Sequence, residues 1–557
     1  MPVASTRSRS LVAGLSVAGL LIPEAIAYAG IAGLAPEHAL VASVAGLVAH
    51  ACVGGIRYAI VSPTSSSAAI LAAAVGALSV STPGGLNALA LSSALVLLAG
   101  VLFVLGAAAP IGHLATFISR PVLRGFAFGL AVTIVIKQLP HIVGIAVAGA
   151  GPVQILLHLV ERIADWRPWT LAIAFTAYAS LRLLKRIPMF QAAFAVILLS
   201  ITAARVFDLQ GHGVALVGRM DLTGMRLALP VLSRDEWLQT AELAFPLVVI
   251  LYAESRGSIR TLALRHNDLV NPNRELAALG AANFLSGVLQ GLPVDAGFSA
   301  SSANEDAGAR SKAAGLVAAI MIVVLLLAAA PWLALSESVL AAVVISALTH
   351  ALDPRPLVAL WRLGRDEILA SSAALAVIVL GVVHGMMLAV LLSILAAVRR
   401  FSQARVSVLG ELEGTRDYVD AARHPEAIVP ARVLIVRPEQ SLFFANTELA
   451  LSQVRRLAEQ RKEVSVLVLS LEESIDLDST AVEAIAEFSA WVVLSKRRLL
   501  LARVKENVRE LLQRTQAPDM AIPCFWSVAD AVTAAHSILS ELSAPIAASQ
   551  RPSYKGS

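Results

Sequence analysis

The stretch VSPTSSS at residues 61–67 interrupts an apolar segment that continues to residue 78, and GFSASSAN at residues 297–304 interrupts a second one in the same manner. Each places hydroxyl groups and small side chains where a membrane helix would begin. Inside a bilayer, non-helical backbone is tolerated only where protein or a water-filled cavity covers it. Paired interruptions in corresponding positions of two halves are the sequence signature of an inverted-repeat transporter with its binding site near the bilayer midplane.

A helix that begins inside the membrane exposes unpaired backbone N–H groups and carries about half a positive charge at its N-terminus. Two such ends that face one another would bind an anion without a fixed cation. The residues that we expect to form this site are Thr64, Ser65, Ser66 and Ser67 of the first interruption and Phe298, Ser299, Ala300, Ser301 and Ser302 of the second. The alternative is structural, because serine and other small residues also permit close helix packing.

The composition indicates a membrane protein. Of the 557 residues, 57% are hydrophobic and 15% are charged, whereas soluble domains are about half apolar and about a quarter charged. Two cysteines, Cys52 and Cys524, provide neither a disulfide framework nor a cysteine-based metal site. The formal charge of +5 is typical of basic residues on cytoplasmic loops, so we expect no nucleic-acid partner.

Residues 1–401 are predicted to form fourteen apolar spans in two sets of seven. The spans lie at about 10–34, 39–56, 59–78, 86–109, 121–139, 168–184 and 188–204, and at about 238–254, 273–291, 292–309, 313–333, 337–350, 367–382 and 384–398. On this topology alternate loops from Arg57 to Arg365 are basic, which places both termini in the cytoplasm. We expect an integral protein of a bacterial inner (plasma) membrane, in contact with membrane lipid.

The pattern changes near residue 400. A polar stretch at 402–428 predicts a linker, and residues 429–545 alternate strand-like and helical segments, which predicts a small cytosolic α/β domain. We expect residues 546–557 to form a disordered tail. The expected strands are 432–436, 464–470 and 499–504, and the expected helices are 446–460, 479–494, 506–514 and 528–542.

Ionisable residues inside apolar spans are costly in lipid and are therefore candidates for function. Glu24 lies in the middle of the first span, and Glu254 ends an apolar run. We expect Glu254, and with it Glu24, to bind a coupling ion, either a proton or Na⁺. The structural alternatives are a hydrogen bond for Glu24 and an ion pair with Arg256 or Arg260 for Glu254. The remaining charges lie nearer the predicted span ends and are interpreted as rim or loop charges: Lys137, Asp295, Glu305 and Asp306.

Several of these motifs resemble a known family. IPEAIAYA at residues 22–29, the Ser62-Pro63-Thr64 break, NRELAALGAAN at residues 273–283 and the 293–308 stretch together are similar to the sulfate permease (SulP) family of anion transporters. The C-terminal part, with IDLDSTA at residues 475–481, resembles the STAS domain that closes most members of that family. The resemblance spans about residues 10–540.

The resemblance implies an α-helical polytopic membrane protein built as a 7+7 transmembrane inverted repeat, followed by a cytosolic α/β STAS domain. Spans 1–4 and 8–11 would form a core domain, and spans 5–7 and 12–14 a gate domain. The substrate would be held between the third and tenth spans, and the core would move like an elevator against the gate. The resemblance also implies a homodimer, to which the STAS domain usually contributes.

Two positions depart from the family pattern. Glu24 stands where many members have Gln, which adds a protonatable group beside the expected site. Ala300 stands where many sulfate-type members have Arg within Ser-Arg-Ser, so a charge partner for sulfate, a fixed dianion, is missing. A monoanion, or a carboxylate that enters with protons, would be easier to hold by helix ends alone.

Ser479 follows Asp478 at a predicted helix start, where related bacterial regulatory STAS domains carry a phosphorylated serine. A serine in this position is more often only an N-cap. A cytosolic protein partner of the domain is a further expectation. The sequence contains no complete phosphate-binding Gly loop, nucleophile elbow or metal-ligand cluster, so we expect a transporter rather than an enzyme, with no cofactor besides its coupling ion, H⁺ or Na⁺.

Together these patterns predict a secondary active transporter of a small anion, of the sulfate, bicarbonate or C4-dicarboxylate class, that works as a proton-coupled symporter. Three alternatives stay open. They are a Na⁺-coupled bicarbonate transporter, an uncoupled anion channel, and an anion-sensing receptor that signals through the STAS domain.

Overall fold

The computed structural model describes residues 4–81, 88–109, 119–147, 151–184, 192–207, 209–211, 214–217, 227, 229–329, 335–349, 351–364, 366–515 and 522–543. The chain divides into two compact units, Met1–Ile394 and Leu395–Ser557. Each unit has its own buried apolar core. The tail predicted at 546–557 lies outside the described residues.

The first unit is helical, and its last helix continues into the second unit. In chain order its elements are α1 (Ala4–Ala32), α2 (Pro36–Val53), β1 (Val61–Ser62), α3 (Ser65–Ser81), α4 (Ala88–Ala108), α5 (Arg120–Val143), α6 (Pro152–Glu161), the 3-10 helix Ile163–Asp165, α7 (Pro168–Leu184), α8 (Ala192–Val206), β2 (Leu216–Val217), α9 (Arg234–His266), α10 (Pro272–Val288), β3 (Asp295–Ala296), α11 (Phe298–Asp306), α12 (Ala313–Ala329), β4 (Leu335–Ser336), α13 (Glu337–Leu348), α14 (Arg355–Leu363), α15 (Glu367–Leu380) and α16 (Val382–Phe401).

The packing of these helices repeats. The segments α1, α2, β1 with α3, α4, α5, α7 and α8 correspond in order to α9, α10, β3 with α11, α12, α13, α15 and α16. α1 packs on α3, α11 and α12, and its counterpart α9 packs on α11, α3 and α4. Likewise α2 packs on α12 as α10 packs on α4, and α7 packs on α13 as α15 packs on α5. This exchange of partners is the pseudo-two-fold relation of an inverted repeat, so the predicted 7+7 fold class is confirmed.

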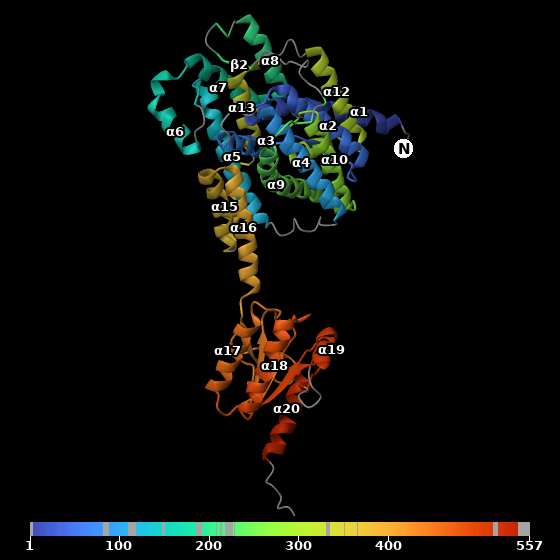
Figure 1. Cartoon of the computed structure of the whole chain (residues 1–557), viewed down its shortest axis with the longest axis vertical. Helices are drawn as coiled ribbons and strands as arrows, with labels where there is room; N and C mark the ends of the chain where they lie inside the picture. The colour runs from blue at the N-terminus through green and yellow to red at the C-terminus, as the bar shows by residue number, and fades with distance from the viewer. Residues whose placement is uncertain are drawn as a thin grey trace, which may run out of the picture. The chain divides into compact units, whose positions relative to one another are not determined.

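The repeat divides the unit into two groups of helices. In Figure 1, α1–α4 gather with α9, α10 and α12 on one side, and α5–α8 gather with α13, α15 and α16 on the other. Close contacts inside each group depend on small residues. A Cβ at Gly100 of α4 would meet the backbone of Phe284 on α10, and a Cβ at Gly125 of α5 would meet the backbone of Ala370 on α15. Small residues let membrane helices approach in this way. We call the first set, with α11, which packs on α1 and α9, the core group and the second the gate helices, after the domains that the resemblance implies.

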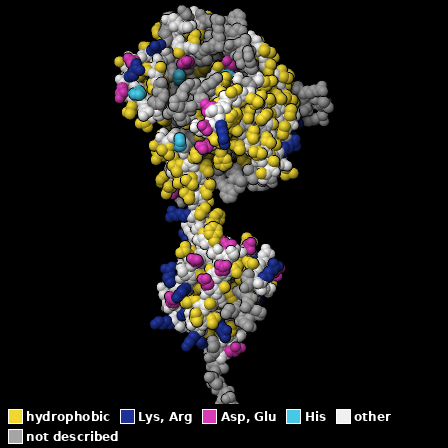
Figure 2. Space-filling model, in the orientation of Figure 1, with side chains coloured by type: hydrophobic (Ala, Val, Ile, Leu, Met, Phe, Trp, Pro, Cys, Tyr) yellow, Lys and Arg dark blue, Asp and Glu magenta, His cyan; other side chains and the backbone are white. Residues whose placement is uncertain are grey.

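The described surface of the first unit carries large areas of hydrophobic side chains (Figure 2). Phe175, Leu327 and Ile368 project from three different helices and are each 72% exposed. Apolar surface of this extent marks contact with a membrane or a partner rather than with water. Among the described residues, five helices are long and apolar enough to cross a membrane, and they begin at Ser10, Pro36, Ala88, Arg120 and His384.

Two details of the helical unit differ from the prediction. α9 continues past residue 254, where the eighth span was expected to end, to His266, so Glu254 lies within a helix and not at its end. α6 and α14 lie at the same place in each repeat, between the fifth and sixth segments, and were not predicted. They are short and amphipathic, so they do not produce the long apolar run that identifies a span.

The second unit is an α/β domain with one five-stranded sheet. Its elements are β5 (Val406–Glu411), β6 (Tyr418–Asp420), β7 (Val433–Pro438), α17 (Thr447–Gln460), β8 (Val466–Ser470), α18 (Ser479–Leu494), β9 (Arg498–Ala502), α19 (Glu506–Thr515) and α20 (Val528–Ser543). The strand order is β6-β5-β7-β8-β9, with β7, β8 and β9 parallel and β5 antiparallel to both of its neighbours.

Alternate residues of the sheet face opposite layers of helices. Leu434 and Val436 of β7 belong to the core formed with α17, α18 and α19, whereas Val433 and Ile435 belong to the core formed with α20. This is the period of two that a strand imposes on its side chains. The sheet is therefore covered by helices on both faces.

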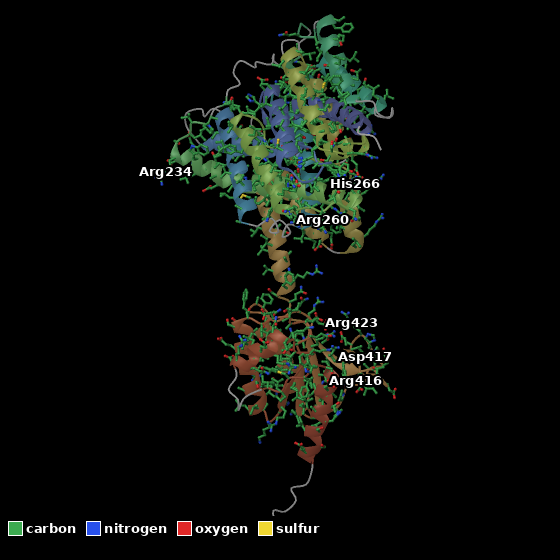
Figure 3. All side chains as sticks on the ribbon, turned by 90° about the vertical axis from the view of Figure 1, so that its right-hand side faces the viewer. Arg234, Arg260, His266, Arg416, Asp417 and Arg423 are labelled. Carbon is green, nitrogen blue, oxygen red and sulfur yellow. The ribbon has the colours of Figure 1, made fainter. Side chains whose placement is uncertain are left out.

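The prediction of a linker at 402–428 is wrong, because β5 and β6 lie within this segment. They pair with Leu409 opposite Asp420 and Glu411 opposite Tyr418, and they form one edge of the sheet. Edge strands commonly carry charged side chains, which is why this segment resembles a polar linker. Arg416 between the two strands donates from Nη2 to Oδ1 of Asp530 on α20 at 2.6 Å, and it lies on one side of the domain together with Asp417 and Arg423 (Figure 3).

Candidate functional site

Two short strands bring the interrupted segments together. β1 and β3 pair antiparallel, with Val61 opposite Ala296 and Ser62 opposite Asp295. β1 leads into α3 and β3 leads into α11, so the two half-helices start from the same place. A Cβ on Gly297, the N-cap of α11, would lie 3.1 Å from Cγ2 of Thr64, which precedes α3. The two N-termini are therefore adjacent.

Thr64 and Ser67 fix the start of α3. Thr64 Oγ1 accepts a hydrogen bond from Ser67 N at 3.2 Å, and Ser67 Oγ accepts one from Thr64 N at 2.9 Å. This is the reciprocal pattern of a capping box. Ser67 is fully buried and also donates its hydroxyl to Thr64 O at 3.0 Å, so it supports the helix start. The amides of Ser65 and Ser66 lie in the first turn, where a helix offers no acceptor, and they are available to an anion.

α11 begins without a side-chain cap, because its N-cap is Gly297. The amides of the first turn therefore have neither an intrahelical acceptor nor a capping oxygen. Phe298 is 48% exposed and Ser299 is also exposed. This end of α11 can present backbone N–H groups and the Ser299 hydroxyl to a ligand.

The next residues of α11 face the protein interior. Ala300 and Ser301 are buried, and Ser301 Oγ accepts a hydrogen bond from Ile60 N at 3.0 Å. Ser301 therefore holds the segment that leads into β1. Ser302 Oγ is enclosed and has no hydrogen-bond partner within the described part of the chain.

Two carboxyl groups complete the surroundings of the α3 start. Thr64 Oγ1 lies 2.7 Å from Asp295 Oδ1, and Ser66 Oγ lies 2.5 Å from Glu254 Oε2. The two hydroxyl oxygens are 3.1 Å apart. The carboxyl groups of Glu254 and Asp295 are themselves within hydrogen-bonding reach of each other. We call the closed set Thr64, Ser66, Glu254 and Asp295 the hydroxyl–carboxyl ring.

The first helix contributes a second carboxyl group and a phenol beside this ring. Tyr28 is 8% exposed, and its hydroxyl is hydrogen-bonded to the carboxyl group of Glu24, one turn earlier on α1. The same hydroxyl lies within electrostatic range of Glu254 and Asp295. α1 packs on both α3 and α11, which brings Glu24 and Tyr28 to the side of the paired half-helices.

The interpretation of Asp295 as a rim or loop charge is wrong. Asp295 is 0% exposed, because β3 pairs with β1 inside the helical unit. A signal for it is present in the sequence. Asp295 stands three residues before the start of α11, as Ser62 stands three residues before the start of α3, so alignment of the two interruptions places it at the site. Among the described residues, no group of three or more His, Cys, Asp or Glu could hold a metal ion.

Polar contacts fasten the far end of α11 to α9. Glu305 Oε1 lies 2.6 Å from His266 Nε2, and Glu305 Oε2 accepts a hydrogen bond from Arg265 at 2.9 Å. The His266 ring also stacks on Tyr58, with 4.0 Å between ring centroids. Tyr58 in turn offers its carbonyl to Asn304 Nδ2 at 3.1 Å. His266 and Arg260 lie toward the same end of the helical unit (Figure 3).

The segment before β1 is also held by α10 and by the loop before it. Glu275 Oε1 accepts hydrogen bonds from Gly55 N at 2.8 Å and from Ile56 N at 3.2 Å. Arg57 Nη2 donates to Asp268 Oδ1 at 2.7 Å, and this contact lowers the pKa of the Asp268 carboxyl group below its usual value. The lead into β1 is therefore fixed at several points.

Ser479 is the first residue of α18 in the second unit, and its side chain is exposed. The N-cap is Asp478, whose Oδ1 accepts a hydrogen bond from Ala481 N at 2.8 Å. Oδ2 of the same carboxylate accepts one from Phe444 N at 2.7 Å. Because Asp478 does the capping, the Ser479 hydroxyl is not used to hold the helix start.

Comparison with known proteins identifies both units. Residues 8–374 match the sulfate permease family, and residues 424–531 match the STAS domain. The chain belongs to the sulfate permease family. It is a membrane transporter of anions in this family and not an enzyme, as the sequence predicts. A probable sulfate transporter of Mycobacterium tuberculosis is 30% identical over 91% of this chain and 91% of that protein. Human solute carrier family 26 member 6 is 26% identical over 85% of this chain and 68% of that protein.

Solved structures agree with this family fold. Murine solute carrier 26 family member A9, an anion transporter in the inward-facing state, superimposes with a TM-score of 0.89 at 20% identity, over 96% of this chain and 92% of that one. The transmembrane domain of a cyanobacterial bicarbonate transporter gives a TM-score of 0.60 at 21% identity, over 71% of this chain and 97% of that one.

Proposed function

We propose that this transporter is a secondary active symporter, in which a small anion binds between the N-termini of α3 and α11 and a proton binds at Glu254. The anion is of the sulfate, bicarbonate or C4-dicarboxylate class. Its binding groups are the first-turn amides of both half-helices together with the hydroxyl groups of Ser65, Ser66 and Ser299. Glu24 contributes a second protonatable group.

The observation that supports this proposal is the contact of Glu254 with the first turn of α3. Its carboxyl oxygen accepts a 2.5 Å hydrogen bond from Ser66, a residue in the first turn of α3. A carboxylate in this position repels an anion at the same helix end, and a proton on the carboxyl group removes that repulsion. Anion and proton therefore favour each other's binding, which is the differential affinity that coupling requires.

Alternating access by an elevator movement is part of the proposal. α3 and α11 belong to the core group, and both contact α9: Ser66 at the start of α3 binds Glu254, and Glu305 at the far end of α11 binds His266. Such a group can move against the gate helices as one body and carry the site across the membrane. We further propose a homodimer in a bacterial inner membrane, with both termini in the cytoplasm and the STAS domain available to a cytosolic protein partner.

The test is uptake by the full-length protein in proteoliposomes with an acidic exterior. [³⁵S]sulfate, [¹⁴C]bicarbonate and [¹⁴C]fumarate are the probes, and the gradient should stimulate uptake of at least one of them. Glu254→Gln should abolish the acid-stimulated component. Glu242→Gln is the matched control, because Glu242 is exposed on the same helix. Unchanged gradient dependence in Glu254→Gln would remove Glu254 from the mechanism.

The same preparation separates the alternatives. Replacement of Na⁺ by choline at constant pH should leave uptake unchanged in a proton symporter and should stop it in a Na⁺-coupled bicarbonate transporter. An uncoupled channel would instead produce currents in a planar bilayer far above carrier turnover. A receptor would bind one of the three anions, seen as a raised unfolding temperature, without any flux.

A further inference from the structure

We propose that Glu254 and Asp295 form one proton-binding site, in which a resident proton is shared between the two carboxyl groups and the coupling proton is the second one that they bind. The inference rests on the proposed proton-coupled transport and adds Asp295 to it as a coupling residue.

The ring has four oxygen–oxygen contacts and too few hydrogens to fill them. Thr64 donates its hydroxyl hydrogen to Asp295, and Ser66 donates its own to Glu254. The Thr64 oxygen also accepts a hydrogen bond from Ser67 N, which suits an oxygen whose hydrogen points toward Asp295. No hydroxyl hydrogen is then left for the contact between Glu254 and Asp295. A proton on one of the two carboxyl groups is required to make that contact a hydrogen bond.

The burial of Asp295 leads to the same requirement. Its Oδ2 is enclosed and has no hydrogen-bond partner among the described residues. A buried carboxylate oxygen without a donor is costly, and two carboxylates in contact repel, so that one of them holds a proton. One shared proton removes both costs, and it leaves the pair with a single negative charge.

The groups around the pair do not supply a compensating cation. α1 presents Glu24 and Tyr28. α3 and α4 contain no charged or titratable residue, and α11 has Glu305 and Asp306 only at its far end. α5 also packs on α3, and its Lys and Arg residues are exposed: Arg120, Arg124 and Lys137. On α9 the neighbours of Glu254 are Tyr252 and Arg256, which interact with one another. In the described part of the protein, no hydrogen bond or ion pair of the ring involves Lys or Arg.

This charge state determines how an anion is loaded. With one resident proton the pair still carries one negative charge beside the two helix N-termini. A second proton, taken from the side on which the anion enters, neutralises the pair and lets the anion bind. On the opposite side the second proton dissociates together with the anion, and the resident proton stays. The neutral pair supplies no positive charge, so the two helix N-termini alone attract the anion where many sulfate-type members have an arginine at the position of Ala300.

Infrared spectroscopy of the purified full-length protein tests the resident proton without any transport. Protonated carboxyl groups give a C=O band that carboxylates lack. At neutral pH, both Asp295→Asn and Glu254→Gln should lose the same band, because either change removes the partner that retains the proton. Asp306→Asn should keep it, since Asp306 is exposed at the end of the same half-helix. A band that survives in Asp295→Asn or in Glu254→Gln overturns the shared proton.

Asn is close in shape to Asp and can still accept the Thr64 hydroxyl, so this variant is expected to fold. If it does not, Asp295→Glu moves the carboxyl group by one methylene, and it should shift the band; an unshifted band overturns the proposal.

Uptake tests the coupling role separately. In proteoliposomes, Asp295→Asn should move the pH of half-maximal [³⁵S]sulfate or [¹⁴C]fumarate uptake to less acidic values by about one unit or more, because the Glu254 carboxylate loses the shared proton that stabilises the singly charged pair. If the infrared band is lost in both variants but the pH profile of uptake is unchanged, the shared proton is supported. Its part in coupling is then overturned. If wild-type uptake of every probe is independent of the pH gradient, the proposed symport is wrong, whatever the infrared result.

Discussion

His266 connects both half-helix segments to α9. Its Nε2 lies 2.6 Å from Oε1 of Glu305 on α11, and its ring stacks at 4.0 Å on Tyr58, which precedes β1. Three turns earlier on α9, Glu254 binds Ser66 of α3. α9 therefore contacts the paired half-helices at two levels, which favours movement of all three as one body.

Replacement of His266 should loosen this connection. His266→Ala loses the stack and the hydrogen bond, which together are worth about 1–3 kcal/mol, so thermal unfolding of the purified protein should begin several degrees lower. His266→Phe keeps a stacking ring and should recover part of the loss. Arg260→Ala is the control, since Arg260 is exposed on the same helix, and it should have almost no effect. Equal stability of His266→Ala and wild type would show that the contacts of His266 do not stabilise the protein.

Thr64 has two roles, and substitution should affect both. Thr64→Ala removes the cap of α3, worth about 1 kcal/mol, and one hydrogen bond to a carboxyl group, worth about 1.5–3 kcal/mol. We expect an at least tenfold lower uptake efficiency, mainly through a higher KM for the transported anion. Thr64→Ser keeps the hydroxyl group and should restore most of the activity. If serine restores nothing, the methyl group of Thr64 and not its hydroxyl is what matters.

The close approach of the two half-helices should make Gly297 sensitive to a single methyl group. A Cβ there would lie 3.1 Å from Thr64 Cγ2, so Gly297→Ala must push the N-termini apart by a few tenths of an ångström. We expect weaker anion binding, measured as a smaller ligand-induced rise in unfolding temperature. Gly76→Ala is the matched control on α3, where a Cβ meets nothing within 4 Å, and it should raise stability by up to about 1 kcal/mol. Identical behaviour of the two variants would contradict the proposed geometry.

The sequence predicted the interrupted segments because their signal is local. Hydroxyl and small residues at 61–67 and 297–304 cannot continue an apolar span, and the structure has a strand and a helix start at each. Asp295 was missed because its environment depends on distant residues. Its partner Thr64 lies 231 positions away, and Glu254 reaches Ser66 over 188 positions. No local pattern reports such a contact, although the equivalence of the two repeats would have located it.

In the C-terminal domain the central strands and helices were predicted, and the edge strands were missed. Its buried central strands and its helices were predicted near their observed positions, and α18 has the predicted bounds Ser479–Leu494. β5 and β6 were not predicted, because edge strands are short and polar and resemble linkers. Their place in the sheet depends on pairing with β7, which a local composition does not reveal.

Asp478, and not Ser479, should control the stability of this domain. Asp478→Ala removes the cap of α18 and the acceptor for Phe444 N, which should cost about 1–3 kcal/mol in urea unfolding of the fragment 402–543. Ser479→Ala should stay within about 0.5 kcal/mol of the parent. A larger loss for Ser479→Ala would mean that its hydroxyl, and not only the Asp478 carboxylate, supports the helix.

The ionisation of Tyr418 should report whether the edge strand β6 is folded. Burial, assisted by the neighbouring Glu411, raises the pKa of Tyr418 to about 12 from its ordinary value of 10.0. The sign follows from the direction: neutral tyrosine favours the folded state below about pH 10, and this contribution is lost as the pH rises from about 10 to about 12. Tyr418 is the one tyrosine of the fragment 402–543, so its ultraviolet absorbance reports it alone. The midpoint should lie near pH 12 in the folded fragment and near pH 10 in urea. Glu411→Gln should lower the folded midpoint, and a folded midpoint near 10 would mean that β6 is not docked against β5.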